Sequence, residues 1–244
     1  MSSSSTSSSA LLLLSFSLLL QIAIGASPLF HICSTSETFT AASTYASNLN
    51  KLIGSLTFRA PFTGFGAASV GFKHDRANGI ALCRGDANAT TCKTCVAEAG
   101  GEIRQRCAQQ KQAIIWYDNC LLKYSNTDFF RKIDEQNKFY MWNLRNVSHP
   151  ASFNRKVKDL LVELAEKAHV ERRMYAAGDS QLGGSKKLYG LVQCTRDLSS
   201  IDCKKCLDGA IDELPSCCNG KEGGRVVGGS CNIRYEIYPF VSSA

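Results

Sequence analysis

The residues in this sequence best suited to chemistry are its twelve cysteines, because most of them repeat one spacing in both halves of the chain. The shared pattern is C-x8-C-x2-C-x11-C-x12-C, and five coincident spacings indicate two copies of one cysteine-framed unit. A C-x2-C pair can bind zinc, act as a thioredoxin-like redox centre or form structural disulfides. The first copy of the pattern consists of Cys83, Cys92, Cys95, Cys107 and Cys120, and the second of Cys194, Cys203, Cys206, Cys218 and Cys231.

Structural disulfides are the chemistry that this pattern favours. Two C-x2-C pairs that share a zinc ion usually lie about 15 to 20 residues apart, whereas these pairs lie in separate repeats. A redox motif does not need the additional flanking cysteines. We therefore expect no metal and no cofactor. Spacing alone does not determine which cysteines pair, because six cysteines allow fifteen pairings.

The amino-terminal residues 1–26 are typical of a secretory signal peptide. A serine-rich start is followed by the apolar run Leu11–Ala23, and the small residues at 25–27 offer a cleavage site after Ala26. No second apolar run is long enough to span a bilayer. We expect a secreted, extracellular protein without a membrane span, which agrees with its cysteine content.

The charge of the chain argues against nucleic acid as a partner. The formal net charge is +7, but the excess is spread along the sequence. The basic pairs at 172–173 and 186–187 lie among ordinary polar residues, without the dense basic face that nucleic-acid binding requires.

Each half of the chain repeats the same order of predicted elements. Apolar residues recur at helical spacing in four segments, and alternation typical of strands fills the intervals. A short polar connector, residues 130–138, joins the two units. The predicted helices cover 38–56, 91–107, 150–168 and 200–216, and the predicted strands lie within 66–84, 113–125, 173–178, 186–197 and 224–240.

The last predicted strand has one polar face that is available for binding. Its residues alternate with a period of two, which is typical of a strand with one buried and one wet face. The turn Gly228-Gly229-Ser230 precedes it. Cys231, Ile233, Tyr235 and Ile237 point one way, and Asn232, Arg234, Glu236 and Tyr238 point the other.

Three features together resemble one family. They are the repeated frame, the segment Phe139-Tyr-Met-Trp-Asn143, and residues 217–225 leading into 231–240. The sequence is similar to plant cysteine-rich repeat secretory proteins, which carry two ginkbilobin-like, stress-antifungal domains. The resemblance implies an α+β fold with two tandem domains, 27–129 and 139–240, each a five-stranded antiparallel sheet with two helices. It also implies disulfides that link Cys33 with Cys107, Cys83 with Cys92, and Cys95 with Cys120, with Cys194, Cys203, Cys206 and Cys231 bonded in the second domain.

The second domain departs from the family pattern at its first cysteine. Trp142 occupies that position, so Cys218 lacks the partner that Cys107 has. Cys217 and Cys218 either form a vicinal disulfide or remain as buried thiols, and the sequence leaves both states open.

The resemblance also implies a sugar site in the second domain. Mannose-binding members of the family use an Asn, an Arg and a Glu at positions that hold Asn143, Arg225 and Glu236 here. The first domain holds Ser34, Ile114 and Ser125 at these positions. An amide, a guanidinium and a carboxylate supply the donors and acceptors that a sugar needs. The alternative is that Glu236 only forms an exposed salt bridge with Arg234, a common surface feature of little energetic value.

Short motifs add weaker hypotheses. Asn88 and Asn146 begin N-glycosylation sequons, and a glycan at Asn146 would crowd Asn143. Arg84-Gly85-Asp86 spells an adhesion tripeptide, for which turn chemistry within the Cys83–Cys92 segment is the simpler explanation.

No arrangement of residues in the sequence indicates an enzyme. The four histidines stand apart, and neither H-E-x-x-H nor G-x-S-x-G occurs. The leading hypothesis is a secreted apoplastic lectin of stress or antifungal defence that binds mannose or mannosylated glycans through its second domain. The other hypothesis is an interaction module that binds no sugar and pairs with receptor-like kinase ectodomains.

Overall fold

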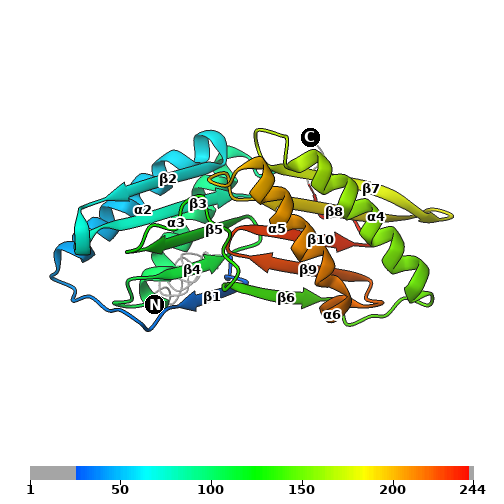
Figure 1. The fold of residues 1–244 in the computed structure, drawn as a ribbon, viewed down its shortest axis with the longest axis horizontal. Coiled ribbons are helices and arrows are strands. Elements are labelled where there is room, and N and C mark those ends of the chain that lie inside the picture. Colours follow the sequence, from blue (N-terminus) through cyan, green and yellow to red (C-terminus); the bar gives the residue numbers. More distant parts are fainter. Residues whose placement is uncertain (1–25, 242–244) are drawn as a thin grey trace, which may run out of the picture.

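The computed structural model describes residues 26–241 and shows two units of similar architecture side by side (Figure 1). The predicted signal peptide lies outside the described residues apart from Ala26. Within the part of the chain described, no helix combines the length and the apolar character needed to cross a membrane.

The first unit is a five-stranded antiparallel sheet with its helices on one face. The strand order is β1-β4-β5-β3-β2. The elements are β1 (Phe30–Cys33), α2 (Thr44–Thr63), β2 (Phe65–Val70), the 3-10 turn η1 (Lys73–Asp75), β3 (Ala77–Cys83), α3 (Ala89–Arg106), β4 (Ala113–Trp116) and β5 (Cys120–Ser125).

The second unit repeats this topology with the strand order β6-β9-β10-β8-β7. The predicted α+β fold with two five-stranded antiparallel sheets is therefore confirmed. The elements are β6 (Lys138–Trp142), α4 (Pro150–Ala168), β7 (Tyr175–Gly183), β8 (Lys186–Cys194), α5 (Ser200–Asp212), α6 (Leu214–Cys218), β9 (Gly223–Gly228) and β10 (Cys231–Glu236).

The first helix begins later and ends later than the sequence pattern predicts. The prediction of 38–56 was wrong at both ends, because α2 covers Thr44–Thr63. Ser43 caps the helix, since its side chain accepts a hydrogen bond from the backbone N–H of Ala46 at 3.2 Å. Gly64 ends it in the left-handed conformation, with φ 81°.

The helix predicted over 200–216 is divided in two. The long part, α5, ends at Asp212, and the short α6 begins at Leu214. Pro215 explains the division, because proline has no N–H to donate and its ring clashes with the preceding turn.

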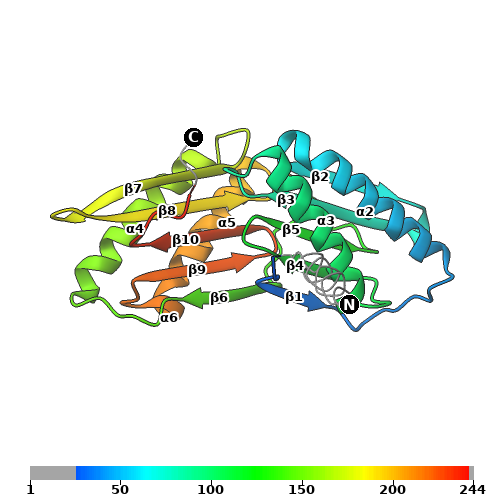
Figure 2. The ribbon, with the colours of Figure 1, turned by 180° about the vertical axis from the view of Figure 1, so that it is seen from behind.

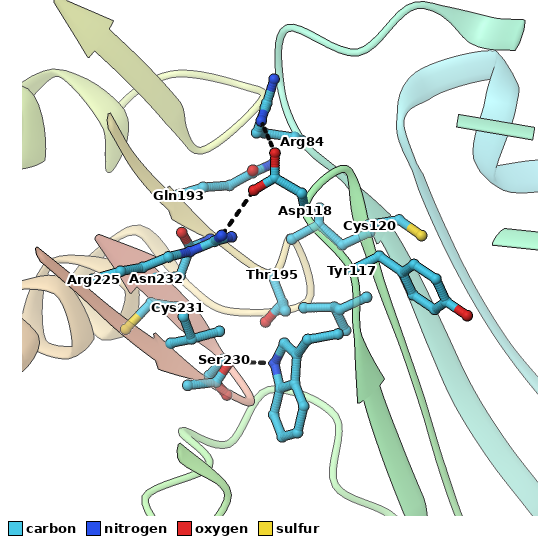
Figure 3. A pocket seen from close by; sticks show the side chains of 15 residues that line it. Arg84, Tyr117, Asp118, Cys120, Gln193, Thr195, Arg225, Ser230, Cys231 and Asn232 are labelled. Carbon is cyan, nitrogen blue, oxygen red and sulfur yellow. Dashed lines mark hydrogen bonds and ion pairs between the residues drawn. The ribbon is translucent and has the colours of Figure 1, made fainter. Parts of the chain in front are cut away.

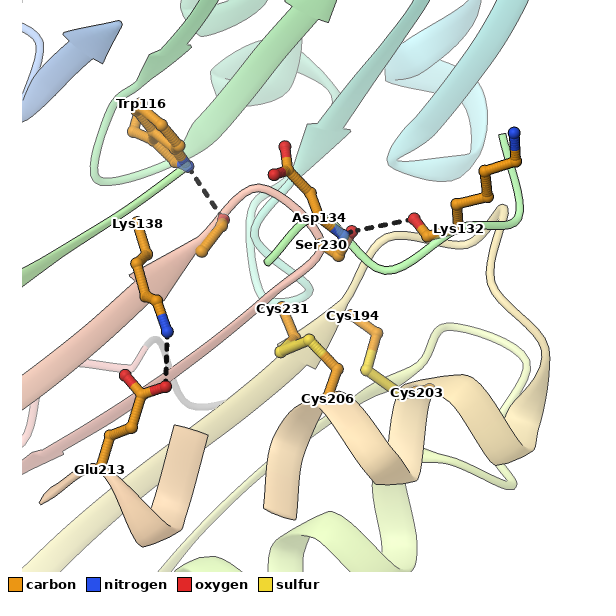
Figure 4. Close-up of a disulfide and its surroundings, with 11 residues drawn as sticks. Trp116, Lys132, Asp134, Lys138, Cys194, Cys203, Cys206, Glu213, Ser230 and Cys231 are labelled. Atoms are coloured by element: carbon orange, nitrogen blue, oxygen red, sulfur yellow. Dashed lines mark hydrogen bonds and ion pairs between the residues drawn. A yellow bond between two sulfur atoms is a disulfide. The ribbon is translucent and has the colours of Figure 1, made fainter. Parts of the chain in front are cut away.

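Disulfides tie helices to sheets in both domains. In the first domain they join Cys33 to Cys107, Cys83 to Cys92, and Cys95 to Cys120. In the second, the bonds Cys194–Cys203 and Cys206–Cys231 do the same, whereas Cys217 is bonded to its neighbour Cys218 within α6. Figure 4 shows the Cys206–Cys231 bond between α5 and β10.

The second domain has no counterpart of the Cys33–Cys107 bond and has a vicinal disulfide instead. Cys217 and Cys218 are bonded to each other, which is one of the two states that the sequence leaves open. Cys218 Sγ lies 3.9 Å from the carbonyl oxygen of Met141, beside the position that Trp142 occupies.

The helices of the two domains cover opposite sides of the molecule. In Figure 1, α4 and α5 lie in front of the second sheet. Figure 2 shows the opposite side of the molecule, where α2 and α3 lie in front of the first sheet. Each helix layer packs on its own sheet to form a separate apolar core. Each sheet therefore keeps one face free of helices.

The helix-free faces of the two sheets meet at the junction between the domains. Trp116 is only 2 % exposed there, packs edge-on against Phe139 with 5.2 Å between ring centroids, and donates from Nε1 to the carbonyl oxygen of Gly228 at 3.1 Å (Figure 4). The apolar cluster at this junction joins the two sheets and contains Ile80, Leu82, Ile114, Trp116, Leu121 and Val227.

The connector lies over part of the first sheet's helix-free face. Phe130 of the connector and the preceding Phe129 pack against the junction cluster. Asp134 forms a buried ion pair of 2.6 Å with Lys123 of β5, and its backbone N–H donates to Ser230 Oγ of the second domain at 2.8 Å. The connector is therefore an ordered part of the interface between the domains.

The chain has two tryptophans, which allows a matched test of this interface. We expect Trp116→Ala to lower the free energy of unfolding by about 3–5 kcal/mol, because it leaves a cavity between the domains. Trp142→Ala, at a side chain that is 49 % exposed, should change it by less than about 0.5 kcal/mol. Guanidinium unfolding followed by circular dichroism measures both, and equal effects of the two substitutions would contradict the role given to Trp116.

Candidate functional site

Asn143, Arg225 and Glu236 line one open cleft of about 320 Å³ on the helix-free side of the second sheet. Asn143 follows the end of β6, Arg225 lies in β9, and Glu236 ends β10. We call this hollow the Arg225 cleft. Its other charged or aromatic walls are Asp118, Trp142, Arg234 and Tyr238.

The register of β9 and β10 determines how these side chains meet. Arg225 is paired with Arg234, and Gly223 with Glu236. A Cβ atom at Gly223 would overlap the Glu236 carboxylate, so only glycine lets this carboxylate lie across β9. Like charges directly opposite each other on two strands destabilise a sheet, so the two arginines require a counter-charge.

The first domain supplies this counter-charge. Asp118, in the turn between β4 and β5, accepts through Oδ1 from Arg225 at 2.9 Å and from Arg234 at 3.3 Å. Its Oδ2 accepts from Arg84 of the first domain at 3.0 Å (Figure 3). Asp118 could not be recognised from the sequence, because it is not one of the repeated cysteines and lies more than 100 residues from Arg225.

A small cavity of about 30 Å³ lies behind this ion cluster, at the junction (Figure 3). Arg225 Nε faces buried surroundings there without a hydrogen-bond partner among residues 26–241. Beside it, Gln193 Nε2 donates to the carbonyl oxygen of Cys83 at 3.0 Å, a further bond between the domains. The guanidinium of Arg225 is thus held from one side by Asp118 and enclosed on the other.

The expected pair of Glu236 and Arg234 is present but is not exposed. Arg234 Nε lies 3.1 Å from Glu236 Oε1, and the two side chains are only 16 % and 12 % exposed. The prediction of an exposed pair was therefore wrong, because Asp118 and the junction between the domains cover this part of the strand. Arg234 and Glu236 therefore do not form an ordinary surface salt bridge.

Burial and charge move the pKa values of the two carboxylates in opposite directions. Burial raises the pKa of Glu236, and Arg234 offsets only part of this effect. Burial opposes ionisation of Asp118 as well, but the charges of Arg225, Arg234 and Arg84 outweigh it and lower its pKa. Asp118 is thus the carboxylate that stays charged to lower pH.

Two aromatic side chains form the walls of the Arg225 cleft. Trp142 is 49 % exposed and Tyr238 is 46 % exposed, so both present ring surface to solvent. In the sequence, Trp142 is notable as part of segment 139–143 and as the replacement of a cysteine, and neither feature indicates a binding wall. Aromatic walls with a few convergent polar groups are typical of small-molecule sites.

Asn143 is fixed at the edge of the cleft by its own turn. Its backbone N–H donates to the carbonyl oxygen of Gly223 at 2.9 Å, and its Oδ1 accepts from the backbone N–H of Arg145 at 2.9 Å. No hydrogen bond of its Nδ2 is found within the described part of the chain.

The equivalent position in the first domain has a different chemistry. Ser34, Ile114 and Ser125 line a second cavity of about 340 Å³, whose other wall is the connector. Lys123 and Asp134 pair with each other across it. This cavity lacks the amide, guanidinium and carboxylate combination of the Arg225 cleft.

The remaining sequence motifs have structural surroundings. Asn88 is exposed and caps α3, accepting from the Thr91 N–H at 2.8 Å, and Asn146 is exposed beside the cleft. Arg84 forms a two-point ion pair with Asp86, at 2.6 and 3.0 Å, and both side chains are nearly buried, so the adhesion tripeptide does not present its charges to solvent. Within residues 26–241, no cluster of His, Cys, Asp and Glu is arranged to hold a metal ion.

Comparison with protein families places this geometry in context. Residues 32–127 and 142–238 both match the model of the salt stress response/antifungal family. The chain belongs to this family. It is a cysteine-rich protein of the secreted type, with two tandem copies of the family's domain.

Curated relatives are similar over nearly their whole length. The chain is 62 % identical over 218 residues to an antimicrobial ginkbilobin-2-like protein of Castanea crenata, covering 89 % of this chain and 90 % of that protein. It is 57 % identical to cysteine-rich repeat secretory protein 38 of Arabidopsis thaliana, covering 88 % and 86 %.

Solved structures share the tandem arrangement. The tandem ectodomain of the Arabidopsis thaliana cysteine-rich receptor-like protein PDLP8 superposes with a TM-score of 0.77 at 23 % identity, covering 87 % of this chain and 98 % of that chain. The corresponding ectodomain of PDLP5 gives 0.72 at 26 % identity, covering 86 % and 99 %. These similarities concern the fold.

The ion cluster generates a prediction about its titration. We expect Arg234→Gln to raise the pKa of both Asp118 and Glu236, because the Arg234 charge favours ionisation of both carboxylates. Arg84→Gln is the matched control and should raise only the pKa of Asp118. Carboxyl ¹³C chemical shifts followed against pH report each group, and an equal response of Glu236 to both substitutions would refute this assignment.

Proposed function

We propose that this protein is a non-enzymatic carbohydrate-binding protein of plant stress or antifungal defence, and that it binds mannose through the Arg225 cleft. The observation that carries the proposal is the convergence of Asn143, Arg225 and Glu236 in one open cleft with aromatic walls. The name of the antimicrobial relative from Castanea crenata agrees with a defence role.

The chemistry of the cleft suits adjacent hydroxyl groups on a pyranose. The amide of Asn143 and the guanidinium of Arg225 are donors, and the Glu236 carboxylate is an acceptor. Charged partners shorten and strengthen such hydrogen bonds. Trp142 and Tyr238 offer ring surface for the apolar face of the sugar. One open cleft of this size predicts weak binding of a single mannose unit. Glycans that present several mannose units should bind with higher affinity.

A second candidate function is pairing with receptor-like kinase ectodomains. One observation favours it: β6 is an edge strand, and its side chains Tyr140 and Met141 are 38 % and 39 % exposed. Edge strands offer unpaired backbone groups to partners. A glycan array separates the candidates, because a mannose-specific signal that is lost on mutation of Glu236 supports the first, and silence supports the second.

The polar residues generate one prediction. We expect Glu236→Gln and Arg225→Ala to weaken retention on mannose resin by about tenfold or more, because each removes a charged hydrogen-bond partner. Ser34→Ala alters the equivalent position of the first domain and should bind like the wild type. If the wild type and the three variants were retained equally, the Arg225 cleft would be excluded as the sugar site.

The aromatic wall generates another prediction. Trp142→Ala should weaken binding of methyl α-D-mannopyranoside by about fivefold, and Trp142→Phe by much less, because a ring contact contributes about 0.5–1.5 kcal/mol. Since Trp142 is half-exposed, the unfolding midpoint of both variants should match the wild type. Titration by NMR measures the affinities, and an unchanged affinity of Trp142→Ala would exclude stacking on this ring.

A further inference from the structure

The Arg225 cleft contains four charged side chains, and one of them comes from the other domain. Arg225 and Arg234 are positive, and Asp118 and Glu236 are negative, so the formal charges that line the cleft sum to zero. The nearby Arg84 is paired with Asp86 as well as with Asp118. The net charge of the cleft is therefore zero only because Asp118 contributes to its lining.

Asp118 is also the most exposed member of its ion cluster. Its side chain is 49 % exposed, whereas those of Arg225, Arg234 and Arg84 are 10 %, 16 % and 12 % exposed. Asp118 is therefore the member of the ion cluster that is most accessible to a ligand in the cleft. An approaching carboxylate is repelled by Asp118, and it would have to displace Asp118 to reach Arg225.

A neutral hexose does not meet this barrier. Its hydroxyl groups can donate to the remaining lone pairs of Asp118 and Glu236 and accept from guanidinium N–H groups, without displacing any ion pair. Like-charge contacts discriminate against wrong ligands more than they strengthen the right one.

We infer that Asp118 of the first domain is a specificity-determining residue of the Arg225 cleft, which makes the cleft accept a neutral hexose and reject the corresponding hexuronate. This inference rests on the proposed sugar-binding function. It assigns the first domain a direct part in recognition, although its own equivalent cavity lacks the three polar residues.

The test uses two probes that differ only at C6. Methyl α-D-mannopyranoside carries a hydroxymethyl group there, and methyl α-D-mannopyranosiduronate carries a carboxylate. NMR titration at neutral pH gives the affinity ratio for the full-length wild type, Asp118→Asn and Asp118→Glu. Asp159→Asn, at an exposed acid of α4, makes the same charge change away from the cleft. Thermal unfolding of each variant confirms that it is folded.

The wild type should prefer the neutral probe by at least about tenfold, and Asp118→Asn should reduce this ratio by about tenfold or more, through a gain in uronate binding that falls at high salt. Asp118→Glu and Asp159→Asn should keep the ratio within about threefold. An unchanged ratio in Asp118→Asn overturns the inference, as does an equal change in Asp159→Asn, and both results leave the proposed function standing if the mannoside still binds.

The two hypotheses fail in distinguishable ways. If the wild type binds neither probe, the proposed mannose function is wrong. In that case a uronate affinity that appears in Asp118→Asn supports the role of Asp118 in excluding anions, and its absence overturns that role as well.

Discussion

The structure depends on how the helix-free face of each sheet is covered. Each sheet has helices on one face only, and the other face of the first sheet carries large apolar side chains. Exposure of such a face to water would be unfavourable, since burial of apolar surface stabilises the folded state by about 25 cal/mol per Å². The second domain and the connector together bury it, with Trp116 and Val227 at the centre of the contact. The apolar composition of this face therefore favours the tandem arrangement.

This packing positions the charged residues of the cleft. Asp118 lies two residues after Trp116, in a turn directed toward the second sheet. Burial of Trp116 thus brings a carboxylate to two arginines that face each other across β9 and β10. Removal of two cations from water needs a close counter-charge, and the other domain provides it. The charged lining of the Arg225 cleft and the packing of the domains therefore share one set of contacts.

Much of the fold follows from the sequence, because the signals for it are local or repeated. The cysteine spacing indicates the duplication, and the periodicity of two around Ile233 and Tyr235 identifies the strand that carries the cleft. Helix ends are less well predicted, since Ser43 and Pro215 act through a cap and a missing N–H that the apolar pattern does not contain.

The candidate site was predictable only in part. Asn143, Arg225 and Glu236 follow from family positions, and the structure brings them to one cleft. Asp118 was not predictable, because its role arises from a contact between domains that no spacing encodes. Residues on one chain segment can be placed by periodicity, but charges that meet across an interface can be placed only when the packing of both faces is known.

The two copies therefore carry different cavities at equivalent positions, and only the cleft of the second copy is lined by residues of both domains. In the first domain the connector lies over the equivalent position, and the Lys123–Asp134 pair occupies it. In the second domain the same face carries the Arg225 cleft, which Arg225 and Glu236 line as largely buried side chains. A second domain on its own would expose Val227 and Phe139 and leave Arg225, opposite Arg234, without the Asp118 carboxylate that pairs with it. The first copy contributes coverage and charge, and this contribution allows the second copy to keep two arginines side by side in an open cleft.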